Sequence, residues 1–337
     1  MTEARRTLDQ GDALITDRQT VAQFLDKWLT EVARPKLRPA TYISYQSKIK
    51  LYLIPALGKY PLAKLAPQQV QAMMNGMSER GLSPRSVQYA RAILRKALNQ
   101  ALKWGMVTKN AAALTEAPRV VRPETAVLTP EQARQFLDAV QGDRLEALYA
   151  VALALGLRQG EALGLRWQDI DLDNGSLRVA VTLQKLPKQP YQLVEPKTRL
   201  SRRTLPLTPT LAAQVRAHRT RQREERLQAG ADWQGQEWGL VFTTPQGSPV
   251  NKFELLKVYK RHLDRAGLPT LRFHDLRHSC ASLLMAQGVH PRVVMEILGH
   301  STITLTMNTY SHVLPSAQRD AAALLDNLFS GPISNVS

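Results

Sequence analysis

The feature that most constrains the fold of this chain is a proline-marked segment, APRVVRPETAVLT, at residues 117–129. It holds two prolines and two arginines and shows neither a helical nor a strand period, which predicts an extended linker. The chain has 337 residues, enough for about two domains that each bury a core. We therefore expect folded domains at residues 20–116 and 129–337, joined by a linker at 117–128 and preceded by an N-terminal segment at 1–19.

The part before the linker is expected to contain helices only, at residues 21–32, 40–53, 67–80 and 84–104. The last helix has the best end signals, because Ser83 can cap it, Pro84 suits its first position and Gly105 follows it. Its apolar residues recur at helical spacing and predict a buried stripe. That stripe consists of Val87, Ala90, Leu94, Ala97, Leu98, Ala101 and Leu102.

The opposite face of the same helix is polar and basic, with Arg85, Arg91 and Arg95 among its residues. Such a face is either an ordinary solvated surface or a surface that contacts phosphate groups. After the linker, helices are expected at residues 129–140, 143–155, 208–229, 252–266, 274–287 and 291–298. Strands are expected at 176–183, 191–194 and 203–207. The predicted fold class is therefore mainly α with a small antiparallel β-sheet.

The charge of the chain narrows the class of partner. Its 45 lysines and arginines exceed 28 acidic residues, giving a formal net charge of +17. This excess favours nucleic acid as the partner, with an anionic membrane surface as the second choice. We find no apolar run of about 18 residues and no signal-peptide pattern, so we expect a soluble, intracellular protein. The single cysteine, Cys280, excludes an intramolecular disulfide framework and a cysteine-rich zinc module.

The stretch RFHDLRHSC supports two different chemistries. His274 and His278 lie four residues apart, as in the zinc-protease pattern H-E-x-x-H with Asp275 in place of Glu. On that interpretation the chain is a zinc metallohydrolase. Arg277, however, would bring a positive charge toward any nearby dication, which favours a site that binds a phosphate.

Three other stretches carry charged or nucleophilic groups. They are LGLRQGEALGLRW with Arg158 and Glu161, VEPKTRLSRRTLPL with Lys197, and ILGHSTITLTMNTYSHV with His300 and Tyr310. Each also has a plain structural interpretation. The arginine can pair with the glutamate at a helix end, the lysine can be solvated in a strand turn, and the tyrosine can be a half-buried aromatic residue.

Taken together and in this order, these motifs resemble the tyrosine site-specific recombinases, the integrases of phages and conjugative elements. The resemblance covers nearly the whole chain, because TVAQFLDKWLTEV, LRPATYISYQSKIKLYLIPALGKYPLAKL and ALKWGMVTKNAA resemble the family's helical, SAM-like core-binding domain. It implies that this domain and a mixed α+β catalytic domain form a C-shaped clamp around double-stranded DNA. The implied activity is cleavage and rejoining of DNA strands through a 3′-phosphotyrosine, which integrates or excises a mobile element.

The resemblance also implies the roles of individual residues. Tyr310 maps to the nucleophile and Lys197 to the acid that protonates the leaving 5′-oxygen. Arg158 and Arg277 map to the arginines that bind the reacting phosphate. The remaining residues of this implied site are His274 and His300, which donate hydrogen bonds or handle protons, Glu161, which orients a neighbour, and His278, which we expect to serve packing.

No cofactor is expected, because a phosphotyrosyl bond conserves the energy of the phosphodiester and no P-loop is present. The runner-up activity within the same chemistry is DNA relaxation like that of a type IB topoisomerase. In the DNA-contacting surface we expect Arg85, Arg91, Arg95, Lys96, Lys36 and Arg38.

Assembly and location are implied in the same way. We expect a homotetramer on paired sites, joined through the C-terminal tail LPSAQRDAAALLDNLF, with an excisionase or DNA-bending protein as a further partner. The expected location is the prokaryotic cytoplasm, at the nucleoid. Residues 1–19 resemble the connecting segment that follows an arm-binding domain in many phage integrases. Either this enzyme uses simple sites or such a domain was removed.

Overall fold

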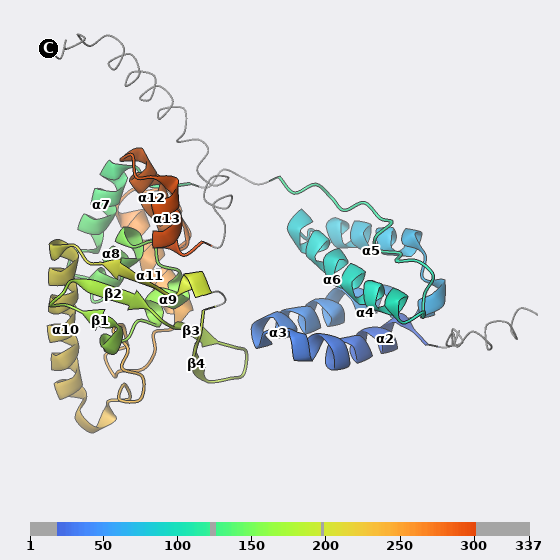
Figure 1. Ribbon diagram of the computed structural model, residues 1–337, viewed down its shortest axis with the longest axis horizontal. Helices are drawn as coiled ribbons and strands as arrows, with labels where there is room; N and C mark the ends of the chain where they lie inside the picture. The colour runs from blue at the N-terminus through green and yellow to red at the C-terminus, as the bar shows by residue number, and fades with distance from the viewer. Residues whose placement is uncertain (1–18, 122–125, 197–198, 301–337) are drawn as a thin grey trace, which may run out of the picture. The chain divides into compact units, whose positions relative to one another are not determined.

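The computed structural model describes residues 19–121, 126–196 and 199–300. The chain divides into two compact units, Met1–Pro123 and Glu124–Ser337 (Figure 1). The described part is mainly helical and carries small antiparallel sheets, so the predicted fold class is confirmed. Lys197 and Tyr310 lie outside the described residues, as does the C-terminal tail.

Unit 1 is a bundle of helices. A π-helical stretch, Trp28–Ala33, continues the first α-helix directly, and another, Ile49–Leu53, joins the second α-helix to the third. Thr20 begins the bundle, because its Oγ1 accepts from the backbone N of Gln23 at 3.3 Å. The α-helices are α2 (Val21–Lys27), α3 (Pro39–Lys48), α4 (Ile54–Leu57), α5 (Pro67–Glu79) and α6 (Pro84–Lys103).

Helix α6 begins and ends as its sequence predicts. The Oγ of Ser83 accepts from the N of Ser86 at 3.3 Å, and Gly105 adopts a left-handed φ of 68° just after the helix. The predicted stripe was wrong at one position, because Leu102 is 42% exposed and Ile93 is buried instead. Ile93 lies three residues after Ala90 and four before Ala97, so it shares their face, whereas Leu102 is turned about 100° from Ala101.

Unit 2 packs helices around a core that includes Phe136, Tyr149 and Leu276. One helix was predicted to begin at residue 143 but begins at Glu146, because Asp143 turns the chain and its Oδ1 accepts from the N of Leu145 at 2.7 Å. Its α-helices are α7 (Pro130–Val140), α8 (Glu146–Ala154), α9 (Gln159–Leu163), α10 (Pro209–Ala229), α11 (Lys252–Arg265), α12 (Asp275–Ala286) and α13 (Pro291–Leu298).

The single strand predicted at residues 176–183 is two strands in different sheets. β2 (Ser176–Val179) pairs antiparallel with β1 (Ile170–Asp171) and β5 (Arg203–Pro206), and β3 (Thr182–Lys185) pairs with β4 (Tyr191–Val194). The break lies close to α9, since a Cβ on Gly164 would lie 2.7 Å from the N of Leu183. A single straight strand could not pair in both sheets, so the chain leaves the first sheet after Val179 and enters the second at Thr182.

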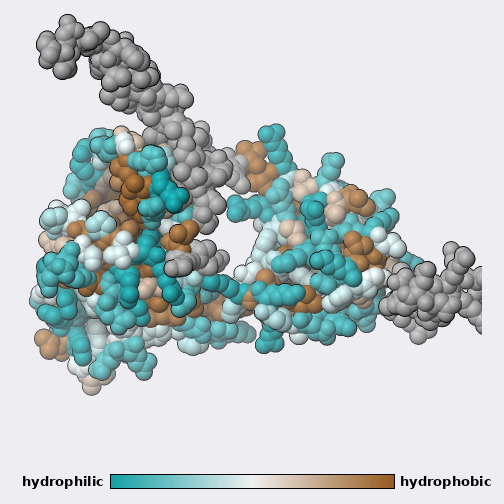
Figure 2. Space-filling model, viewed as in Figure 1, coloured by the Kyte–Doolittle hydropathy of each residue, from teal (hydrophilic) through white to brown (hydrophobic). Residues whose placement is uncertain are grey.

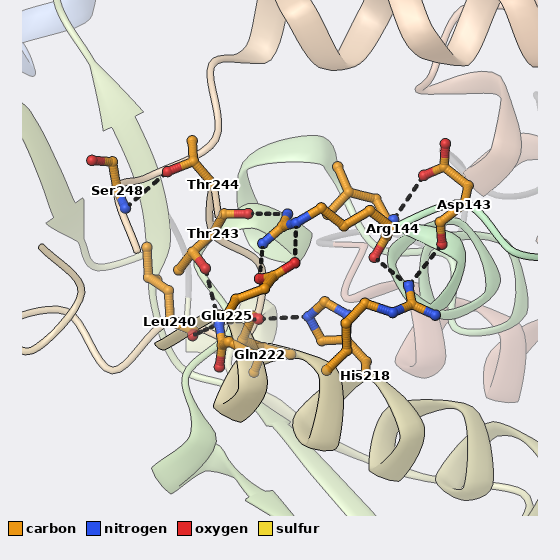
Figure 3. Close-up of polar contacts among 12 residues, drawn as sticks. Asp143, Arg144, His218, Gln222, Glu225, Leu240, Thr243, Thr244 and Ser248 are labelled. Carbon is orange, nitrogen blue, oxygen red and sulfur yellow. Dashed lines mark hydrogen bonds and ion pairs between the residues drawn. The ribbon is translucent and has the colours of Figure 1, made fainter. Parts of the chain in front are cut away.

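A polar network fixes α10 to the turn that precedes α8 (Figure 3). The guanidinium of Arg144 binds the carboxylate of Glu225 and the carbonyl of Thr243. From α10, Arg221 donates to the carbonyl of Asp143 at 3.0 Å, and Nε2 of His218 lies 2.8 Å from the carbonyl of Val241. These contacts hold the start of α8, whose far end leads into the LGLR motif.

Hydrophilic side chains cover much of the visible face of both units, and hydrophobic side chains appear among them in separate groups (Figure 2). Large exposed apolar residues occur on different elements, such as Leu51, Leu114 and Phe253. Among the described residues, no helix is both long and apolar enough to cross a membrane.

Candidate active site

Arg158 lies just before α9 and is held by Glu161 within that helix. The carboxylate of Glu161 accepts from the backbone N of Arg158 at 3.0 Å and from its Nη1 at 2.6 Å. The side chain of Glu161 is 2% exposed, whereas that of Arg158 is 37% exposed. The plain pairing considered from the sequence is therefore present, and it leaves part of the arginine open to solvent.

Arg277 approaches the same motif from α12. It is 1% exposed, and its Nη1 donates to the carbonyl of Gly156 at 2.8 Å, two residues before Arg158. Gly156 has a left-handed φ of 59°, and a Cβ there would lie 2.4 Å from the Cδ2 of Leu298 on α13. The left-handed backbone favours glycine at this position, where the chain after α8 packs against Cys280 of α12 and Leu298 of α13.

Three histidines surround these arginines. His274 immediately precedes α12, and its ring centroid lies 5.0 Å from that of His278. His300 follows α13 and is 7% exposed. Desolvation, strengthened by His278 and the two arginines, lowers the pKa of His274 to about 4 even though its side chain has an exposed edge. Desolvation followed by Arg277 and Arg158 lowers the pKa of His300 to about 3.

These shifts make both imidazoles neutral at pH 7 in the absence of an anion. A neutral imidazole donates one hydrogen bond and accepts another. An anionic phosphate beside the arginines would oppose the repulsion that lowers these pKa values. The site therefore places two imidazoles that are neutral at pH 7 beside the guanidinium groups of Arg158 and Arg277.

Acidification is expected to destabilise unit 2 through His300. Since the folded-state pKa is about 3 and the ordinary value is 6.5, the unfolded chain takes up the proton first as pH falls. The stabilising contribution is full above about pH 6.5 and declines below it, by up to about 2 kcal/mol between pH 7 and 5. Urea denaturation at these two pH values measures it.

His300→Gln should lose a smaller part of its unfolding free energy than the wild type over that pH interval. The control is His290→Asn, because His290 is exposed and Asn preserves the side-chain cap at the start of α13. An unchanged pH dependence in His300→Gln would contradict the assignment of the proton to this residue.

Sequence reasoning missed one buried charge at this site, Arg203 on β5. Its side chain is 7% exposed, and its Nη2 lies 3.1 Å from Oε2 of Glu161. The signal was present, because residues 203, 205 and 207 point to one side of an extended chain and both leucines are buried. Burial alone raises the pKa of Glu161, but Arg203 and Arg158 outweigh it and hold that pKa below its ordinary value.

The side chains that could act as metal ligands give little support to the zinc pattern. Among the described residues, no group of three or more His, Cys, Asp or Glu side chains is placed to hold a metal ion. Asp275, expected at the start of a helix, does begin α12, and its carboxylate pairs with Arg272 at 2.7 Å. The residues around His274 thus fit an anion better than a dication.

A second candidate surface is a basic cleft of about 810 Å³ in unit 1. Three cations line it, Lys48, Arg85 and Arg119, together with hydroxyl and amide donors at the start of α6, and none of its described lining residues is acidic. Among the other residues expected at DNA, Arg95, Lys96, Lys36 and Arg38 are exposed.

Arg91 also belongs to the expected DNA surface, but its guanidinium turns inward. Its Nε donates to Oγ1 of Thr115 at 2.9 Å, and its Nη2 donates to the carbonyl of the same residue at 2.5 Å. Arg91 thus ties α6 to the segment that leads out of unit 1.

Sequence comparisons match both units. A model described as the phage integrase family matches residues 126–317, and one described as the phage integrase N-terminal SAM-like domain matches residues 20–78. A tyrosine recombinase XerC-like protein of Caldanaerobacter subterraneus subsp. tengcongensis is 34% identical, over 92% of this chain and 83% of that protein. An integrase of Saccharopolyspora erythraea is 30% identical, over 93% and 83%.

Solved structures share the fold. A Tn1549 transposon integrase in complex with a circular intermediate DNA superposes with a TM-score of 0.77 at 22% identity, covering 91% of this chain and 99% of that one. A lambda integrase dimer bound to a COC′ core site gives a TM-score of 0.66 at 20% identity, covering 91% and 79%. Both likenesses span the helical unit and the mixed unit.

Proposed function

The chain belongs to the phage integrase family of tyrosine recombinases, and from this premise we propose how its residues cleave and rejoin DNA during site-specific recombination of a mobile element. The observation that most supports a phosphoryl-transfer site is the grouping of Arg158 and Arg277 with two histidines whose pKa values are lowered, first by desolvation and then by neighbouring charges that include both arginines. Two arginines beside neutral proton carriers match the needs of a pentacoordinate phosphorus, which develops charge on its oxygens.

In the proposed reaction, the phenol oxygen of Tyr310 attacks the scissile phosphorus. The bond between phosphorus and the 5′-oxygen breaks, and that oxygen takes a proton from Lys197. The phenol proton passes to His274 or His300 or to water. An unperturbed phenol with a pKa of about 10 is a weak nucleophile at neutral pH, so attack depends on neutralisation of the phosphate by the arginines.

Rejoining follows from the same chemistry in reverse. The 5′-hydroxyl of a partner strand attacks the phosphotyrosine, which restores a phosphodiester and releases the phenol. No ATP is needed, because the number and type of phosphoester bonds are unchanged, and in this proposal Arg158 and Arg277 supply the positive charge that a metal ion would otherwise bring. Relaxation like that of a type IB topoisomerase is not favoured, because the family and the two relatives described above are integrases and recombinases.

Covalent capture in EDTA tests this proposal. A library of duplexes, each nicked so that the cleaved end diffuses away, is incubated with the protein and resolved on a denaturing gel. We expect a slowly migrating adduct at the 3′ side of the cleavage point. Tight binding without an adduct, or cleavage that depends on a divalent cation, would contradict tyrosine chemistry.

We further propose that residues 20–116 form the core-binding domain, that the linker at 117–128 connects it to the catalytic domain at 129–337, and that the basic cleft of unit 1 contacts DNA phosphates. Its lysine and two arginines carry three positive charges, and its serine, tyrosine and glutamine side chains can donate hydrogen bonds to phosphate oxygens. Such contacts position a protein on a duplex without specifying sequence. They release counterions, so their number is measurable from the salt dependence of binding.

Replacing Lys48, Arg85 and Arg119 together by Gln should reduce the salt dependence of DNA binding. Each lost phosphate contact lowers the slope of log Kobs against log salt concentration by about 0.9, so the triple variant should lose about 2 to 3 units of slope. Fluorescence anisotropy at a series of salt concentrations measures this slope.

Lys27→Gln serves as the matched control, because Lys27 is an exposed cation of unit 1 outside the cleft. Its slope should stay within about half a unit of the wild-type slope. A triple variant that keeps the wild-type slope would show that the cleft does not contact the duplex.

The last part of the proposal concerns how several copies of the chain assemble on DNA. A lambda integrase tetramer bound to a Holliday junction shares this fold, with a TM-score of 0.65 and 20% identity, covering 90% of this chain and 82% of that one. We infer that this chain acts as a homotetramer on paired sites, joined through its C-terminal tail. An excisionase or DNA-bending protein would control the direction of recombination. We also infer that the reaction takes place in the prokaryotic cytoplasm, at the nucleoid, because DNA is the substrate.

A further inference from the structure

Arg203 bonds to three segments that are distant in sequence. Its Nη2 lies 3.1 Å from Oε2 of Glu161, its Nε donates to the carbonyl of Ile297 at 2.5 Å, and its Nη1 donates to the carbonyl of Ser201 at 3.1 Å. All three guanidinium nitrogens therefore have protein acceptors. A rigid planar guanidinium directs donors from three separate nitrogens to acceptors that lie apart, whereas a lysine ammonium directs its three donors from a single nitrogen.

The first partner connects Arg203 to Arg158. The carboxylate of Glu161 lies between the two arginines and binds both, Arg158 through Oε1 at 2.6 Å and Arg203 through Oε2. Because Glu161 is 2% exposed, water cannot replace either arginine beside it. The direction of the Arg158 side chain thus depends on a carboxylate that Arg203 holds from the opposite side.

The second partner connects Arg203 to His300. Ile297 belongs to the last turn of α13, three residues before His300. The intervening Gly299 is left-handed, and a Cβ on it would lie 2.9 Å from the carbonyl oxygen of Leu200 and 3.1 Å from Nη1 of Arg203. The turn that carries His300 therefore packs directly on the backbone before β5 and on the Arg203 guanidinium.

The third partner lies on the segment that follows Lys197. Ser201 ends a short 3₁₀ turn, Arg199–Ser201, and its carbonyl accepts from Arg203. The buried side chain of Arg203 is therefore bonded to three places around the site. These are α9, which follows Arg158, the end of α13, which precedes His300, and the turn that leads from Lys197 into β5. The bonds to these catalytic groups are indirect, since Arg203 itself is buried.

We propose, on the premise of the recombinase chemistry above, that Arg203 is a positioning residue that sets Arg158 and His300 relative to each other around the reacting phosphate. Phosphoryl transfer is sensitive to such placement, because displacement of a catalytic group by about 1 Å costs on the order of 100-fold in rate. Loss of Arg203 should slow chemistry far more than it weakens DNA binding.

The test compares Arg203→Met and Arg203→Lys with Arg178→Met. Arg178 is the matched control, because it lies on the adjacent strand β2 of the same sheet and its side chain is 60% exposed. Affinity for a nicked duplex is measured by anisotropy in EDTA, and adduct formation is measured in single turnover at saturating protein. Thermal unfolding by circular dichroism establishes that each variant is folded.

We expect Arg203→Met to form the adduct about 100-fold more slowly, with affinity within about twofold of wild type. Arg203→Lys should lose about tenfold, because it keeps a positive charge beside Glu161 but reaches fewer acceptors. It also provides the readout if Arg203→Met does not fold. Arg178→Met should remain within about twofold of wild type, since its exposed side chain pairs with Asp169, which Arg166 also holds.

A duplex with a neutral methylphosphonate at the scissile position distinguishes misplaced catalytic groups from a general loss of structure in the site. Its phosphorus needs less positive charge in the transition state, so the deficit of the Arg203 variants should shrink by about tenfold on it. An equal deficit on both duplexes, or rates that match Arg178→Met, would overturn the positioning role. A wild-type protein that forms no adduct on any duplex would instead contradict the proposed recombinase function.

Discussion

Tyr310→Phe is expected to abolish the covalent protein–DNA adduct while leaving affinity for the duplex within about twofold of wild type. The substitution removes only the oxygen that attacks phosphorus, and loss of a catalytic nucleophile costs on the order of 10⁴-fold or more in rate. Denaturing gels of nicked duplexes in EDTA, with time points extended to hours, measure the residual adduct. Phenylalanine differs from tyrosine only by the hydroxyl, so the loss is assigned to the missing oxygen.

The control for this experiment is Tyr191→Phe. Tyr191 is a half-buried tyrosine of β4 whose ring faces the ammonium of Lys185 at 4.6 Å. Its substitution should leave adduct formation unchanged, since the ring and its cation contact are retained. An adduct that persists in Tyr310→Phe would mean that another residue is the nucleophile, and a dependence on magnesium or zinc would reopen the metal interpretation of HDLRH.

Arg277→Met is expected to reduce adduct formation by about 10³- to 10⁴-fold, since an arginine that stabilises a phosphoryl-transfer transition state supplies an effect of that order. Arg277 is 1% exposed beside Gly156, so its charge acts in a site from which water is largely excluded. Methionine has a similar length and leaves no unpaired buried charge. Single-turnover adduct formation at saturating protein measures the loss.

Arg292→Met is a suitable control, because Arg292 lies on α13 with its side chain 62% exposed and pairs with Glu296 of the same helix. It should react within about twofold of wild type. Arg277→Lys should fall between the two, because it retains a positive charge without the planar fork. If Arg277→Met kept half of the wild-type rate, Arg277 would not bind the reacting phosphate.

Much of the local structure follows from residues close together in sequence. The bounds of α6 could be predicted from the sequence, because its end signals each act within one helical turn. These signals are the capping serine before the helix, the proline at its first position and the glycine after it. The same holds for the start of α12 at Asp275. Where a prediction was wrong, as for one strand at 176–183, the deciding contact was with α9, which the strand pattern does not contain.

The sequence by itself determined the basic charge, the division into a helical and a mixed part, and the ordered set of motifs that resembles a recombinase, because composition and short-range pattern carry that information. Only the tertiary structure decided that Arg277 meets the backbone of Gly156, 121 residues away, and that Arg91 turns inward. It also decided that Arg203 shares Glu161 with Arg158. Each arrangement depends on a guanidinium finding hydrogen-bond acceptors that are far away in the sequence. Those acceptors come within reach only when the helices and strands pack together.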